Sequence, residues 1–184
     1  QTATRSARLP AVKTIADFDF SFQPSVKREQ IESLHTLGFI ERKENVVAMF
    51  SLETMGYYSD EEGRQTYPPF LRSLYPTTGN FIAFVGNTAS KQLVTDVIAS
   101  FRRHAKFPSE GIATWETLQG IGLSDHWSFW KQGYPALMVT DTAFFRYHYY
   151  HTPEDTPDKI DYERLARVVA GLERVIDELA NPES

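Results

Sequence analysis

Three short apolar runs, separated by stretches with a helical pattern, constrain the fold of this chain most. The runs are VVAMFSL (46–52), FIAFVGN (81–87) and PALMVTD (135–141). Each has the length of a strand and is bounded by charged or turn-forming residues, which is typical of strands buried on both faces. Helical patterns follow them at 88–105, at 124–133 and, with a wide apolar stripe, at 160–180. This alternation predicts an α/β fold, in which helices flank a layered sheet.

The ends of the expected helices carry capping residues. Thr88 or Ser90 is expected to cap the helix at 88–105, because hydroxyl side chains accept hydrogen bonds from free backbone amides. Ser124 or Asp125 is expected to cap the short helix at 124–133, and Gly133 is expected to end it.

Three segments between these elements lack periodicity and are rich in proline, glycine and turn residues: 57–80, 107–123 and 142–158. We expect them to be surface loops, and long loops in compact domains are often functional. A further helical pattern lies earlier in the chain, at 24–38.

Composition excludes several classes of function. The chain of 184 residues carries 19 Lys and Arg against 24 Asp and Glu, a net charge of −5. This balance argues against nucleic-acid binding, which needs a surplus of cations. The absence of cysteine excludes disulfides and thiolate metal sites. No apolar run has the length of a membrane span and the start lacks a hydrophobic signal core, so a soluble chain without a membrane partner is expected; its compartment is unassigned.

Two residues occupy positions where α/β folds place their chemistry. Loops at the carboxyl ends of strands gather functional side chains, and Glu53 follows the first expected strand directly, while His151 lies in the loop after the third. Both can bind a metal ion, and Thr152 and Glu154 could orient the imidazole. From the residues alone, Glu53 could equally mark a strand emerging into solvent, and His151 could be a surface residue.

Asp125 and Tyr149 are further candidates with open alternatives. Asp125 could cap its helix, support a nearby site, or do both. Tyr149, in the run YHYY, could donate a hydrogen bond to a developing oxyanion, or belong to a mixed aromatic surface.

The order of SLETMGYY, SDHWSFW, GYPAL and YHTPEDTPD, followed by a long helix, resembles the C-terminal half of the bacterial zinc aminopeptidases, a family that includes the glutaminyl cyclases. The resemblance covers 46–184. It implies a partial zinc-exopeptidase-like fold, zinc as the cofactor and a peptide as the substrate. It places Glu53 as a carboxylate ligand of one zinc, His151 as a histidine ligand of the other, and Asp125 in a supporting position. In such enzymes metal-activated water, helped by a glutamate base, attacks the N-terminal peptide bond.

Other parts of that family pattern are absent. The family has an upstream H-x-D and an E-E pair before the position of Glu53. Here the histidine that precedes Glu53 is His35, in HTLGF, and the pair Glu61-Glu62 follows Glu53. A catalytic zinc normally has three protein ligands. We therefore expect an incomplete exopeptidase site; the alternatives are an active hydrolase completed by unrecognised residues and an inactive remnant that acts as a scaffold.

Residues 8–47 resemble the N-terminus of ATP-binding helper proteins encoded by insertion sequences. In that family a strand like ENVV leads into a glycine-rich phosphate loop, but AMFSLETMG follows here. Without those glycines and the lysine, ATP binding is not expected. We interpret the chain as a fusion, with a helical lead-in at 1–45 and a partial peptidase-like domain at 46–184. Sheet edges left open in such a partial domain would favour self-association.

Overall fold

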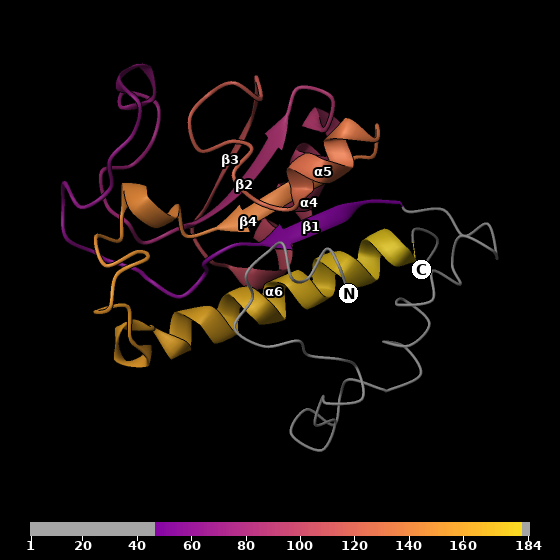
Figure 1. Ribbon diagram of the computed structural model, residues 1–184. Coiled ribbons are helices and arrows are strands. Elements are labelled where there is room, and N and C mark those ends of the chain that lie inside the picture. Colours follow the sequence, from indigo (N-terminus) through magenta and orange to yellow (C-terminus); the bar gives the residue numbers. More distant parts are fainter. Residues whose placement is uncertain (1–46, 182–184) are drawn as a thin grey trace, which may run out of the picture. The chain divides into compact units, whose positions relative to one another are not determined.

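The structure is a computed structural model that describes residues 47–181 (Figure 1). The lead-in at 1–45 and the helix expected at 24–38 therefore lie outside the described residues, and their assignments stay predictions.

A four-stranded mixed sheet forms the centre of the described domain. Its strands are β1 (Met49–Leu52), β2 (Ile82–Asn87), β3 (Ser109–Thr114) and β4 (Ala136–Thr140), in the order β1-β4-β2-β3. β1 pairs parallel to β4 and β2 parallel to β3, whereas β2 and β4 are antiparallel. The predicted α/β class, a layered sheet flanked by helices, is confirmed.

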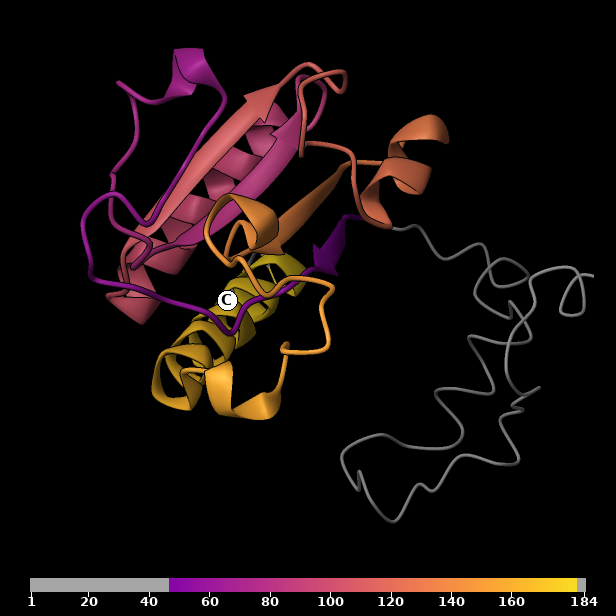
Figure 2. The same ribbon diagram turned by 60° about the vertical axis from the view of Figure 1, so that its left-hand side comes forward.

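Helices cover the sheet because apolar side chains alternate between its two faces. Against one face pack α4 (Lys91–Ala105) and α6 (Tyr162–Ala180), and Figure 2 shows α4 behind the arrows of β2 and β3. The other face is covered by α5 (His126–Lys131) and by loops. In the described part of the chain, three 3-10 turns complete the elements: η2 (Pro69–Leu71), η3 (Ala143–Phe145) and η4 (Pro157–Lys159).

Two expectations about strands were wrong. The segment 107–123 was expected to be a loop, but β3 lies within it. Its sequence, SEGIAT, has a low intrinsic preference for the strand conformation. Parallel pairing with the buried β2 stabilises the strand instead. β1 was expected to be buried on both faces, yet Leu52 is 58% exposed. Within residues 47–181, β1 pairs only with β4 and is an edge strand. Association of copies through such edges stays a prediction.

The helix ends follow the predicted residues but not the predicted bonds. Ser90 and Asp125 are the N-cap residues of α4 and α5, and neither side chain makes a capping hydrogen bond. The Asn87 side chain accepts the Ser90 amide instead, at 2.8 Å. Gly133, with φ of +79°, adopts the left-handed conformation that ends α5 as predicted.

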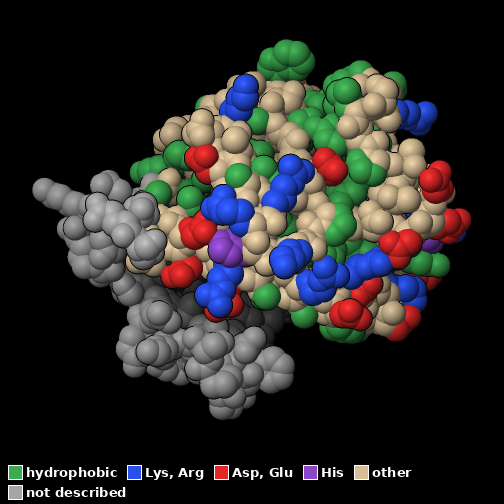
Figure 3. Space-filling model, turned by 180° about the vertical axis from the view of Figure 1, so that it is seen from behind, with side chains coloured by type: hydrophobic (Ala, Val, Ile, Leu, Met, Phe, Trp, Pro, Cys, Tyr) green, Lys and Arg blue, Asp and Glu red, His purple; other side chains and the backbone are tan. Residues whose placement is uncertain are grey.

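Charged side chains lie on the outer surface of α4 and α6. Figure 3 shows basic and acidic side chains interspersed across the face seen from behind. Near the end of α6, Glu178 accepts hydrogen bonds from Ser100, His104 and Arg103, and these lower its pKa to about 2. Within residues 47–181, no helix combines the length and the hydrophobicity that a membrane crossing requires.

Gly171 allows α6 to approach α4 closely, which gives a first prediction. A Cβ at this buried position would lie 2.6 Å from Cβ of Ala105 and 2.6 Å from the Phe101 ring. Overpacking costs about 1–3 kcal/mol, and it should outweigh the helix preference of Ala over Gly, about 1 kcal/mol. Gly171→Ala should therefore lower the free energy of unfolding in chemical denaturation. The control is Ala170→Gly on the exposed face, which should be destabilising from helix preference alone. A Gly171→Ala protein more stable than wild type would contradict the packing argument.

Candidate functional site

A row of four side chains crosses one face of the sheet near the carboxyl ends of β1 and β4. In the strand register, Thr140 lies opposite Ala83, and Ala83 lies opposite Glu110. Glu53 extends the row because its amide donates to the Val139 carbonyl, 3.0 Å away, and so continues the β1–β4 ladder. Side chains opposite each other in a sheet point to the same face. Glu53 and Glu110 are therefore the two ends of one row.

A cavity of about 110 Å³ opens above this row. The loops 57–80, 107–123 and 142–158, expected to be functional, form much of its wall. Most of the lining is apolar or aromatic, and among residues 47–181 Glu53 and Glu110 are its only acidic members. The main apolar contributors are Tyr67, Leu71, Phe81, Ile112, Met138 and Phe145.

Ser124 holds the Glu53 carboxylate. Its hydroxyl donates to Oε2 of Glu53 at 3.0 Å and lies 2.6 Å from the hydroxyl of Ser51. The neighbouring Asp125 is exposed. The contact with Glu53 thus comes from the residue before Asp125, which sequence reasoning considered only as a cap. A supporting role of Asp125 stays a prediction.

Tyr150 and His151 bring the second candidate motif to the same cavity. Tyr150 lines the cavity together with Glu53, and its ring stacks on the exposed His151 with centroids 3.8 Å apart. Burial, followed by the charges of Glu53 and Asp141, raises the pKa of Tyr150. Tyr149 is not among the lining residues; its ring contacts His148 and Tyr147 instead. The structure therefore puts the neighbouring phenol in the cavity, and the oxyanion role assigned to Tyr149 stays a prediction.

Strained backbone gathers at this edge of the sheet. Of the described non-glycine residues, five have positive φ, and one of these, Lys106, merely ends α4. The other four lie in the loops after β1 and β4: Thr54 (+43°), Thr142 (+73°), Ala143 (+41°) and His151 (+59°). Such conformations cost about 1–3 kcal/mol each and persist only where the surroundings enforce them.

Asp141 enforces the conformation of these loops. It is 2% exposed and accepts hydrogen bonds from Oγ1 of Thr54 at 2.8 Å, the Tyr57 amide at 2.8 Å and the Ala143 amide at 3.0 Å. Asp141 was not predicted as a functional residue, although it ends the run PALMVTD and Glu53 directly follows the run VVAMFSL.

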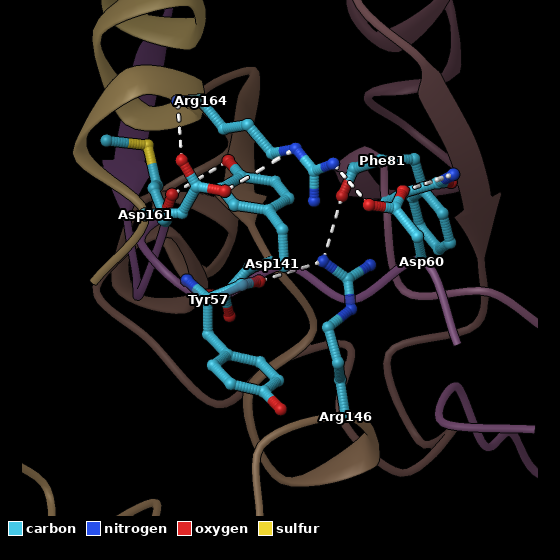
Figure 4. A network of polar contacts seen from close by, with 10 residues as sticks. Tyr57, Asp60, Phe81, Asp141, Arg146, Asp161 and Arg164 are labelled. Atoms are coloured by element: carbon cyan, nitrogen blue, oxygen red, sulfur yellow. Dashed lines mark hydrogen bonds and ion pairs between the residues drawn. The ribbon is translucent and has the colours of Figure 1, made fainter. Parts of the chain in front are cut away.

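Arg146 is 4% exposed and connects the loop 142–158 with the loop 57–80 and with Phe81. Its Nε donates to the Gln65 side chain at 2.8 Å. Figure 4 shows the contacts of Nη1, which donates to the carbonyls of Phe81 at 3.0 Å and Tyr57 at 3.2 Å. The guanidinium also lies 4.5 Å from the centre of the Phe81 ring. Burial lowers the pKa of Arg146 to about 10, which leaves it charged at neutral pH.

The donors of residues 47–181 do not form a complete zinc site. Glu53 lines the cavity and His151 stacks on the cavity residue Tyr150, but no group of three or more His, Asp or Glu side chains in the described part of the chain could hold a metal ion. Because a catalytic zinc needs three protein ligands, these residues alone do not fit the metal of the family.

Comparisons with known proteins agree with the fold and with both resemblances. The sequence profile of peptidase family M28 matches residues 34–176, and that of the IstB-like ATP binding protein matches residues 1–51. YfbL of Escherichia coli (strain K12) is 40% identical over 128 residues, which are 69% of this chain and 40% of YfbL. The chain thus spans less than half of that relative.

Two solved structures share the fold. LapB from Legionella pneumophila has a TM-score of 0.55 at 20% identity, over 77% of this chain and 33% of LapB. The LapA aminopeptidase from the same organism has a TM-score of 0.53 at 18% identity, over 79% of this chain and 34% of LapA. The zinc-exopeptidase-like fold predicted from the sequence is confirmed, and the chain belongs to peptidase family M28.

Proposed function

We propose that this domain is a peptide-binding part of a zinc exopeptidase, with Glu53 and His151 as two of the metal donors. It holds a peptide N-terminus at the cavity, and hydrolysis requires further donors from outside residues 47–181. The single observation that carries the proposal is that Glu53 and Tyr150 line the same apolar cavity and that His151 stacks on the ring of Tyr150.

The surroundings of the two donors support this assignment. Ser124 orients the carboxylate of Glu53, and second contacts of this kind position metal ligands. His151 is presented by a strained turn, in which the Thr152 amide donates to the Tyr149 carbonyl at 2.9 Å. Strain that the surrounding structure maintains is more frequent at functional sites than elsewhere.

Zinc binding tests the donor pair. Competition with a chromogenic chelator should reveal weak, reversible zinc binding by the wild-type chain, since two donors are fewer than the three or four protein ligands of a zinc site. His151→Ala should weaken it by at least about tenfold, as even losing a residue that only supports a ligand costs 10–100-fold. The matched control is His148→Ala, an exposed histidine three residues earlier, which should leave the affinity unchanged. Zinc affinity unaffected by His151→Ala would refute the ligand assignment.

Activity tests whether hydrolysis needs further donors. The chain alone should release chromophore from aminoacyl anilides no faster than buffer does. A chelator-sensitive rate above buffer, lost in Glu53→Gln, would show instead that the chain completes its own site and is an active aminopeptidase.

A further inference from the structure

We propose that Glu110 makes the cavity a binding site for the cationic side chain of a peptide whose N-terminal residue is lysine or arginine. The inference rests on the proposed function in one respect: the peptide N-terminus is taken to lie at the Glu53 side of the cavity.

The sheet register fixes the spacing of the two carboxylates. Glu53 and Glu110 are the ends of a row that crosses all four strands. Three strand spacings separate their backbones, roughly 14 Å. The residues between them on the floor are Thr140 and Ala83, whose small side chains leave the floor open. A long, unbranched side chain that enters beside Glu53 can therefore extend along the floor towards Glu110.

The charge of Glu110 has no partner in the described part of the chain. No hydrogen bond or ion pair there involves its carboxylate. Burial raises the pKa of Glu110, and the charge of Arg102 opposes that rise without making an ion pair with Glu110. The guanidinium of Arg102 itself donates hydrogen bonds to Ser109, to both the hydroxyl and the backbone carbonyl of that residue. A half-buried carboxylate without a partner is unfavourable, and a bound cation would relieve that cost.

The apolar walls fit the rest of such a side chain. Lysine and arginine place their methylene stems against apolar surface while the charged end reaches a polar group. Here the stem would lie between the loop that carries Tyr67 and Tyr75 and the sheet, and both phenols are already bound to carbonyls, those of Pro76 and Gly111. Glu110 is then the group left to recognise the charge.

Two tripeptide amides separate charge from shape. Lys-Ala-Ala-amide and norleucine-Ala-Ala-amide have the same four-carbon stem, and only the first ends in an ammonium group. In titration calorimetry the wild-type chain should bind the lysine peptide about tenfold more tightly, the effect of one charge-assisted hydrogen bond. Glu110→Gln should abolish that difference. Glu62→Gln removes an equal charge from an exposed position outside the cavity and should preserve it.

Two outcomes would overturn the inference. One is equal affinity of the wild-type chain for the two peptides. The other is an equal loss of discrimination in Glu110→Gln and Glu62→Gln, which would indicate a long-range effect of net charge.

The same titration distinguishes this inference from the proposed function. Performed in zinc-free buffer with His151→Ala, it should still show the preference for lysine, because Glu110 acts without the metal. A preference retained there, with zinc affinity independent of His151, would refute the donor pair and support the role of Glu110.

Discussion

Replacing Arg146 by methionine should lower the free energy of unfolding by about 3 kcal/mol. The substitution leaves the buried carbonyl of Phe81 and the partly buried carbonyl of Tyr57 without this donor, and a buried group without a partner costs about 1–3 kcal/mol. An opposing effect exists, because burial lowers the pKa of Arg146 to about 10 and removing the charge recovers part of that desolvation cost. Two orphaned carbonyls and the lost stacking on the Phe81 ring should outweigh it.

Arg164 provides the matched control for this experiment. It pairs with Asp60 and Asp161 at the surface (Figure 4), and exposed ion pairs contribute at most about 1 kcal/mol. Arg164→Met should therefore cost less than a third of what Arg146→Met costs in urea denaturation. Equal costs would mean that the buried network adds nothing beyond an ordinary surface pair.

The network around Arg146 also shows which parts of the fold the sequence could not reveal. Continuous apolar runs predicted β1, β2 and β4, and helical periodicity predicted α4, α5 and α6, since each of these patterns is local. The donors of Arg146 reach partners 65, 81 and 89 positions away in the sequence. β3 was missed for the same reason, because its strand character comes from pairing with β2 and not from SEGIAT itself.

The candidate site divides along the same line. The positions of Glu53 and His151 in the loops after β1 and β4 were predictable because each loop follows an apolar run, and parallel pairing of β1 with β4 brings these loops to one edge. Their role as metal ligands stays a prediction. Glu110 gave no signal, as it lies in a segment without periodicity. Its position in the same row as Glu53 depends on β2 running antiparallel to β4, so that the start of β3 lies level with the end of β1 across the sheet. If all four strands were parallel, Glu53 and Glu110 would lie at opposite ends of the strands. The mixed sheet brings them to the same end.

Asp141→Ala should lower the free energy of unfolding by about 3–4 kcal/mol, because the Thr54 hydroxyl and the amides of Tyr57 and Ala143 lose their shared acceptor. Asp141→Asn should cost about half as much, since one amide oxygen still accepts while the new NH₂ group faces donors. Asp155→Ala is the control: Asp155 is an exposed carboxylate that accepts one hydrogen bond from Tyr147, and its loss should stay below about 1 kcal/mol.

A second measurement separates the role of Asp141 in the site from its role in stability. Asp141 holds Thr54, beside Glu53, in a left-handed conformation. In Asp141→Asn, under conditions where the variant is fully folded, zinc affinity should fall together with the loosening of this turn. Removing the negative charge should also lower the pKa of Tyr150, which Asp141 raises, and absorbance titration of the phenol would record it. An Asp141→Asn protein that binds zinc as wild type does would show that Asp141 stabilises the domain without positioning Glu53.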